Sequence, residues 1–199
     1  MNWDFKKKKE VFAWSMYDFA NQPFTTLIVT FIFSAFFTES LAENNQEGTY
    51  LWSLGISITA IFVAVCSPIL GALADSGGYR KLFLMFFSYL CIISTCCLYF
   101  FEPGQIFSLI IYFKTTTIFG LNLDVAILAL IVFVIANIGF EFGTVFCNSY
   151  LSDLANTKNM GKISGYAWGL GFIGGLISLA ITFLFLDLTQ IEHIRLINL

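Results

Sequence analysis

Residues 124–147 read DVAILALIVFVIANIGFEFGTVFC, an almost unbroken run of apolar side chains. A membrane-spanning helix needs about 20 such residues, because the hydrocarbon core is about 30 Å thick and a helix rises about 1.5 Å per residue. Four further runs of this kind occur at residues 14–38, 51–74, 82–101 and 164–186. The apolar stretch 106–113 is too short to cross, so we expect five spans, with six as the alternative. The sequence therefore predicts an all-α integral membrane protein.

The composition of the whole chain agrees with this prediction. Of its 199 residues, 58% are hydrophobic and only 12% are charged, whereas a soluble domain has roughly 25% charged residues. Too few charges remain to cover a water-exposed surface, which excludes soluble enzymes, nucleic-acid-binding proteins and disordered linkers. We expect the lipid bilayer as the surroundings of the chain and no nucleic-acid partner.

The residues that usually build catalytic or metal sites are sparse. The five cysteines lie inside apolar runs without a CxxC pair or a histidine cluster, and the single histidine, His193, lies in the polar C-terminal stretch. Such cysteines are expected to be small buried apolar residues. With no nucleophile–base pair and no metal-ligand spacing, we expect neither an enzyme nor a cofactor or metal ion.

The distribution of basic residues predicts the orientation, because cytoplasmic loops are enriched in lysine and arginine. With the N-terminus in the cytoplasm, the outer segments hold only Lys114 and Arg195, and the inner ones hold Lys6, Lys7, Lys8, Lys9, Arg80, Lys81, Lys158 and Lys162. Trp14 and Tyr17 on the inner side and Trp52 on the outer side are expected as interfacial anchors. The short, loop-poor chain favours the inner membrane of a bacterium.

Polar side chains inside the span at 124–147 are candidates for function, because charge at bilayer depth is costly. Glu141 shares one helix face with Asn137, Thr144 and Asn148. None of the five spans contains lysine or arginine, so we expect Glu141 to exchange protons or to bind a cationic group of a substrate. The alternative is a protonated Glu141 that is hydrogen-bonded to Asn137 or to a neighbouring helix.

The span at 14–38 repeats this design. Asp18, Asn21 and Gln22 lie on one face, and Pro23 interrupts the backbone hydrogen bonds there. Lipid would not tolerate such faces, so the polar faces of the two helices are expected to line a shared aqueous or ligand-filled cavity. The alternative for Asp18 is a position in a helix cap or among the headgroups.

The last span is rich in small residues at helical spacing, including Gly165, Gly169, Gly171 and Gly175. Such residues let membrane helices approach closely. We expect this face to pack against another helix rather than to bind a ligand.

Residues 71–81, GALADSGGYRK, join the second and third spans on the inner side. Gly71 is expected to let a helix end pack closely, and Asp75 to accept hydrogen bonds from the N-terminus of another helix. Gly78 with its neighbour Gly77 permits a reversal with positive φ, and Arg80 and Lys81 can hold the loop at the anionic leaflet. The alternative is an ordinary basic turn with an incidental aspartate.

This loop resembles the signature loop of the major facilitator superfamily, although Ser76 and Tyr79 stand where the superfamily usually has arginine or lysine. Further segments resemble one branch of it, the vacuole-effluxer-like branch related to the fungal autophagy-related vacuolar permease. They are WSMYDFANQPF at 14–24, ANIGFE at 136–141, NSYLSDLA at 148–155 and GKISGYAWG at 161–169.

The resemblance implies a secondary transporter that works by alternating access, with a cavity lined by the first and fourth helices between two six-helix halves. It also implies amino acids as the leading substrates, protons or another gradient as the driving force, and a cytoplasmic latch at Asp75, Arg80 and Lys81. The resemblance ends before a sixth helix, so we expect a fragment that is inactive alone and needs the missing C-terminal half or a partner chain. The alternative function is a non-transporting membrane scaffold whose polar faces dock partner helices.

Overall fold

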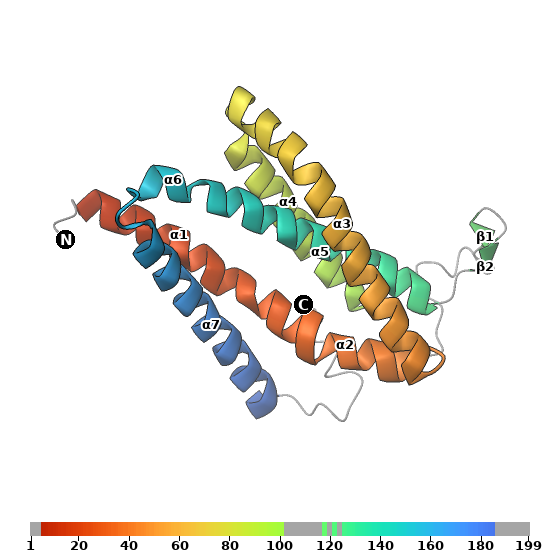
Figure 1. Cartoon of the computed structure of the whole chain (residues 1–199). Coiled ribbons are helices and arrows are strands. Elements are labelled where there is room, and N and C mark those ends of the chain that lie inside the picture. Colours follow the sequence, from red (N-terminus) through yellow and green to blue (C-terminus); the bar gives the residue numbers. More distant parts are fainter. Residues whose placement is uncertain (1–4, 102–116, 119–120, 123–124, 186–199) are drawn as a thin grey trace.

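The computed structural model of the chain describes residues 5–101, 117–118, 121–122 and 125–185 (Figure 1). Two π-helical segments, η1 and η2, interrupt the α-helices of the first span. The helical elements are α1 (Phe5–Pro23), η1 (Phe24–Phe31), α2 (Phe33–Phe36), η2 (Phe37–Leu41), α3 (Asn45–Gly77), α4 (Arg80–Leu98), α5 (Val125–Ser149), α6 (Leu151–Leu154) and α7 (Met160–Phe185). A short antiparallel pair joins β1 (Thr117–Ile118) to β2 (Leu121–Asn122). The apolar stretch 106–113 and His193 lie outside the described residues.

Five helices in the described part of the chain are long and apolar enough to cross a membrane. They run over Lys7–Leu41, Asn45–Gly77, Arg80–Leu98, Val125–Leu154 and Met160–Phe185. The first of these joins α1, η1, α2 and η2 into one rod, and the fourth joins α5 to α6. The prediction of an all-α membrane protein is confirmed, and the described residues contain five helices that can serve as its spans.

Helix α3 is longer than the apolar run at 51–74 that predicted it, because residues on both sides of the run continue and cap the helix. At its start, the Asn44 side chain accepts a hydrogen bond from the Glu47 backbone N–H at 2.9 Å, which is a favourable N-cap. At its end, Gly78 adopts a left-handed conformation with φ of 67°. The turn between α3 and α4 is therefore only Gly78 and Tyr79, and the preceding part of the expected loop, from Gly71 on, is helix.

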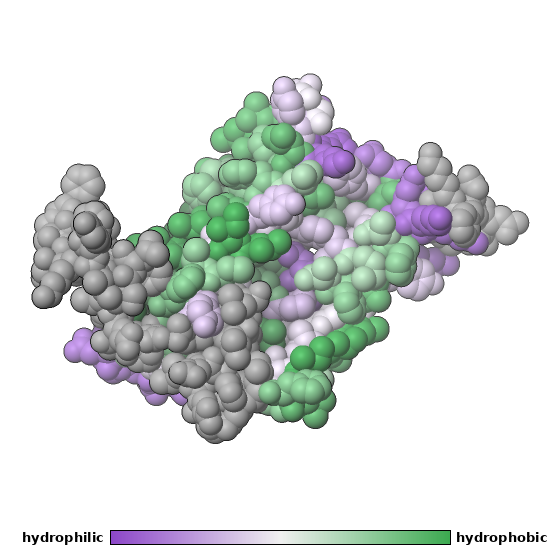
Figure 2. Space-filling model, turned by 180° about the vertical axis from the view of Figure 1, so that it is seen from behind, coloured by the Kyte–Doolittle hydropathy of each residue, from purple (hydrophilic) through white to green (hydrophobic). Residues whose placement is uncertain are grey.

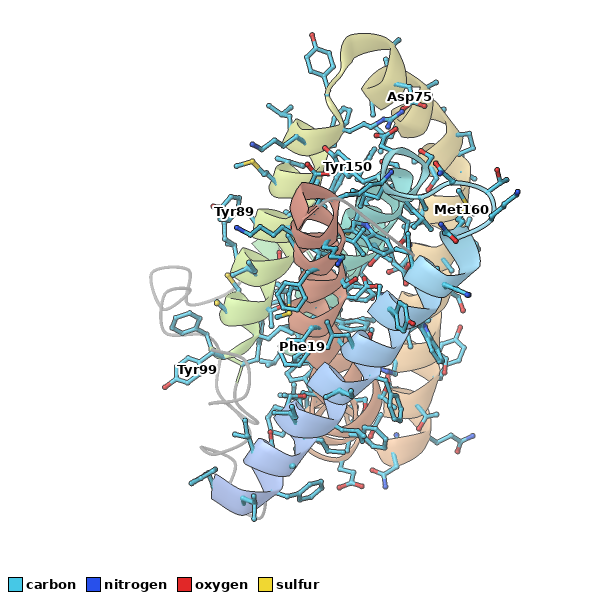
Figure 3. The ribbon with its side chains drawn as sticks, turned by 90° about the vertical axis from the view of Figure 1, so that its left-hand side faces the viewer. Phe19, Asp75, Tyr89, Tyr99, Tyr150 and Met160 are labelled. Carbon is cyan, nitrogen blue, oxygen red and sulfur yellow. The ribbon has the colours of Figure 1, made fainter. Side chains whose placement is uncertain are left out.

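The spans pack in pairs, with α4 along α5, α7 along α1, and α3 against α5 (Figure 1). Asp75, Tyr150 and Met160 lie toward one end of the bundle, and Phe19 lies nearer the middle of its length (Figure 3). We call this end the basic end, because the helix ends that meet there carry Lys7, Lys8, Lys9, Arg80, Lys81, Lys158 and Lys162. Figure 2 shows hydrophilic residues mostly toward the two ends of the molecule and hydrophobic ones between them, as a bilayer requires.

The first span changes its helix type at Pro23. Proline has no backbone N–H, so it cannot donate to the carbonyl of Phe19, and its ring crowds that turn. The α-helix ends at this residue, and the chain continues as the wider π-helix η1. π-helical turns are frequent at functional sites, and this one follows directly after the polar residues Asp18, Asn21 and Gln22.

Two tryptophans expected at the membrane interface are buried inside the bundle. The ring of Trp52 stacks on Phe133 with centroids 3.9 Å apart, beside Phe33 and Phe37. Trp14 is only 8% exposed, and its indole N–H donates to the Cys147 carbonyl at 2.8 Å. The interfacial role predicted for both residues is wrong, because the indole N–H and ring find partners within the protein.

Tyr17 also lies inside the bundle, where it connects three spans. Its hydroxyl is 2.9 Å from the hydroxyl of Ser88 on α4, and a Cβ added at Gly143 of α5 would come within 2.6 Å of it. Glycine at position 143 therefore provides the space that the phenol group occupies.

We predict that Tyr17→Phe lowers the free energy of unfolding by about 0.6 kcal/mol, the average for hydrogen bonds between membrane helices. The ring and its packing stay, so the change removes only the hydrogen bond. Unfolding of the full-length protein in bicelles would measure this cost. Ser88→Ala should lower the free energy of unfolding by a similar amount. The double variant should lose no more than the less stable of the two single variants, because both substitutions remove the same hydrogen bond. Fully additive losses would show that the two hydroxyls do not interact.

Candidate functional site

A polar cavity of about 250 Å³ lies between α1, α5 and α7. It collects polar side chains from three spans that are far apart in the sequence. Its lining residues are Trp14, Asp18, Asn21, Gln22, Phe140, Thr144, Asn148, Ser164, Trp168 and Gly171. Five of the candidate residues named from the sequence, on two helices, thus come together around one hollow: Asp18, Asn21, Gln22, Thr144 and Asn148.

Hydrogen bonds orient the groups at the centre of this cavity. The Asn21 side-chain N–H donates to the Thr144 hydroxyl at 3.3 Å, and that hydroxyl donates to the Phe140 carbonyl at 3.0 Å. The carbonyl oxygen of the Asn21 side chain stays available as an acceptor. Because Asn21 belongs to α1 and Thr144 to α5, these hydrogen bonds also connect the two polar faces.

Asn137 and Glu141 are the two candidate residues that do not line this cavity. Asn137 is buried, with 5% of its surface exposed, and its side chain makes no hydrogen bond to another described residue. Glu141 is half-buried on α5. It lies one residue from Phe140 and three from Thr144 in the sequence, and both of these residues line the cavity although Glu141 does not.

The glycines of α7 divide between two faces. A Cβ added at Gly171 would come within 3.3 Å of the Asp18 carbonyl, and one at Gly175 within 2.6 Å of the Thr26 hydroxyl. One at Gly174 would collide with the Phe19 carbonyl oxygen. These three glycines pack against α1, as expected for small residues.

Gly165 and Gly169 differ from this expectation. No atom of the described structure lies within 4 Å of a Cβ built at either position, so neither packs against a helix there. Gly161, Gly165 and Gly169 follow one another at intervals of four residues and lie on a face of α7 that is turned away from α1. Gly171, Gly174 and Gly175 lie on the face that is turned toward α1.

A charged cluster lies at the basic end. Arg80 binds two aspartates, Asp75 at 2.6 Å through its Nε and Asp153 at 3.1 Å through an Nη atom. The sequence analysis expected Asp75 to accept hydrogen bonds from the N-terminus of another helix. In the structure it pairs with the guanidinium group of Arg80 instead. Arg80, at the start of α4, thus connects the end of α3 to α6, although exposed pairs of this kind add little stability.

The other residues expected in this loop behave differently from one another. Gly78 has the positive φ that was predicted. Gly71 lies within α3, and a Cβ there would meet no described atom within 4 Å, so close packing does not explain this glycine. Lys81 is exposed and makes no ion pair with the part of the chain that the structure describes.

Comparison with known proteins decides which family this architecture represents. A family model described as "Vacuole effluxer Atg22 like" matches residues 50–194, which is more than half of the chain. The chain belongs to this family. The Atg22-like assignment confirms the resemblance that the sequence segments indicated.

A bacterial protein is similar to this Atg22-like chain. The "Uncharacterized MFS-type transporter YxiO" of Bacillus subtilis (strain 168) is 30% identical over 190 residues, which are 94% of this chain and 40% of the relative. The chain thus spans about 40% of the length of the curated relative it matches. No solved structure was found that matches it.

Sequence reasoning missed several residues of the Atg22-like chain that the structure brings to its polar sites, and three of them lie outside the two predicted polar faces. Ser164 and Trp168 of α7 line the cavity, and their spacing of four residues, followed by Gly171 three residues later, indicates one helix face. Asp153 reaches Arg80 across 73 positions in the sequence. Nothing local to Asp153 marks that contact, whereas the face on α7 could have been found by its spacing.

Proposed function

We propose that this Atg22-like chain forms part of a secondary active transporter of small solutes, with amino acids as the leading class. The observation that carries the proposal is the polar cavity between α1, α5 and α7 within an apolar bundle. Polar groups at membrane depth usually mark a path for substrates or ions. The family description and the name of the Bacillus relative support the same activity.

Alternating access needs two bodies that move against each other around a central site. Because the chain spans 40% of its relative, we propose that a second half completes the cavity, either as further sequence of the same protein or as a partner chain. In this proposal the five spans alone do not transport.

We further propose that the basic end faces the cytoplasm, as the enrichment of lysine and arginine in cytoplasmic loops favours. The Bacillus relative supports a bacterial inner membrane. Arg80, Asp75 and Asp153 would then form a cytoplasmic latch together with Lys81. Such exposed charges can exchange partners at low cost, which suits a contact that opens and closes in each cycle.

Glu141 is the proposed proton-exchanging group. It is half-buried on α5, next in the sequence to the cavity-lining Phe140, and the described residues give it no cationic partner. A carboxylate in this position can be neutral in one state of the cycle and ionised in another. The alternative role is a structural one, with a permanently protonated side chain.

The test uses the full-length protein in vesicles and two assays of alanine flux. Counterflow measures exchange without a pH gradient, and accumulation measures coupling to an imposed one. Glu141→Gln should abolish pH-driven accumulation and keep counterflow within about threefold of the unaltered protein. Asn148→Ala, which removes a cavity hydrogen-bonding group, should reduce both by up to about tenfold. Glu43→Gln, an exposed carboxylate outside the cavity, is the matched control.

Each outcome separates the hypotheses. Unchanged flux in both Glu141→Gln and Asn148→Ala would refute the site assignment. If the unaltered protein exchanges none of a broad panel of amino acids and other small solutes, the transporter proposal fails and a membrane scaffold is favoured.

A further inference from the structure

The charge of the cavity indicates what it can hold. Of the ten lining residues, Asp18 is the only acid, and none is lysine, arginine or histidine. A carboxylate that is partly removed from water stays ionised only if a cation nearby compensates for the lost hydration, and otherwise takes up a proton. The described residues offer Asp18 no ion pair, so a cationic ligand is the partner that would keep this carboxylate ionised.

The aromatic part of the lining favours the same kind of ligand. The indole N–H of Trp14 is engaged by the Cys147 carbonyl, so this side chain offers the cavity its ring and not a donor. Two further aromatic residues, Phe140 of α5 and Trp168 of α7, line the cavity. Organic ammonium groups bind well against aromatic rings, and tryptophan is the best of them.

The oriented hydrogen bonds add a second acceptor. The hydroxyl proton of Thr144 is used by the Phe140 carbonyl, and the Asn21 amide N–H is used by Thr144. Asn21 is left with its carbonyl oxygen as an acceptor and with its second amide N–H as a donor. Asn21 and Asp18 are three residues apart on one face of α1, so two acceptors from one helix face the same hollow.

We propose that Asp18 binds the protonated amine of the solute, with the side-chain carbonyl of Asn21 as a second acceptor and the rings of Trp14 and Trp168 as walls. This inference rests on the proposed transport function and specifies its ligand class, which is a small amine with at least one ammonium group. The lining contributed by the described residues contains no cationic group to bind a carboxylate, so we expect a cationic amine to bind more tightly than a zwitterion of the same size. We expect an anion of that size to bind most weakly of the three.

Three probes that share the methyl side chain of alanine and differ in charge test this order of affinities. Alaninamide is a cation, alanine a zwitterion and N-acetylalanine an anion. Their affinities for the purified full-length protein in nanodiscs are measured by thermal shift, which does not require transport. We expect alaninamide to bind more tightly than alanine, and at least about tenfold more tightly than N-acetylalanine, because charge-assisted hydrogen bonds are the strong ones.

Variants at Asp18 assign the effect to this residue. Asp18→Asn, which keeps the shape of the side chain, should weaken alaninamide binding about tenfold or more and remove the charge preference. Asp18→Glu keeps the charge and should keep the preference, which guards against misfolding as the cause. Glu43→Gln should bind all three probes as the unaltered protein does.

The outcomes distinguish this inference from the transport proposal. Equal affinity of the unaltered protein for all three probes, or a charge preference that survives in Asp18→Asn, would overturn the inference even if alanine flux is normal. Asp18-dependent binding of alaninamide without any flux would support the inference and count against transport.

Discussion

Replacement of Gly139 by valine is expected to lower the free energy of unfolding by at least about 3 kcal/mol, the upper end for overpacked interiors. A Cβ at this position would lie 2.7 Å from the Cys91 backbone nitrogen and 2.8 Å from the Phe87 carbonyl oxygen. Both neighbours are main-chain atoms of α4, which cannot rotate away as a side chain can. The variant must separate α4 from α5, and these two helices share the most extensive contact in the bundle.

Heating the full-length protein and measuring the fraction that stays monodisperse by size-exclusion chromatography would test this expectation. Gly161→Val is the matched control, because no described atom lies within 4 Å of a Cβ at Gly161. The control should change the free energy of unfolding by no more than about 0.5 kcal/mol, as surface substitutions usually do. If both variants were equally stable, the close approach of α4 and α5 at Gly139 would be wrong.

Gly174→Ala is expected to cost about 1–3 kcal/mol of unfolding free energy and to reduce solute flux beyond the loss of folded protein. A methyl group there would collide with the Phe19 carbonyl oxygen on α1. That carbonyl lacks the N–H donor that position 23 would supply, since residue 23 is proline. The close approach of Gly174 allows a Cα–H contact to the same oxygen, a weak interaction that recurs between helices.

The effect on flux follows from the place of this contact. α1 and α7 form two walls of the polar cavity, so moving them apart changes the spacing of Asp18 and Trp168. Flux normalised to the amount of folded protein would separate this effect from stability. Gly165→Ala on the same helix has no described neighbour and should be neutral. The reverse order, a damaging Gly165→Ala and a harmless Gly174→Ala, would contradict the assignment of faces.

The sequence predicted the spans well because the property that defines them is local. A run of apolar residues of sufficient length must form a helix in lipid, where every backbone polar group needs an internal partner. The polar faces of α1 and α5 were also predictable from the 3.6-residue period. The same period wrongly grouped Asn137 and Glu141 with the cavity residues, because it gives a direction around the helix and not the depth or width of a hollow.

The errors concern contacts between distant residues. Trp14 and Trp52 were expected at the interface, which is typical of tryptophan in membrane proteins. Their burial depends on the Cys147 carbonyl and on the ring of Phe133, partners that lie on a different helix. No pattern within α1 or α3 indicates that these partners exist.

The sequence by itself determined that the chain is a five-span membrane protein, that two of its helices carry polar faces, and which family it resembles. Apolar length, helical period and short motifs are properties of neighbouring residues, so they can be read along the chain. Only the tertiary structure decided that α7 completes the cavity, that Gly174 and not Gly165 meets another helix, and that Arg80 holds Asp153. Lipid is as apolar as the helix surfaces it covers, so burial of apolar area does not select which faces meet. Shape and hydrogen bonding between distant segments make that choice.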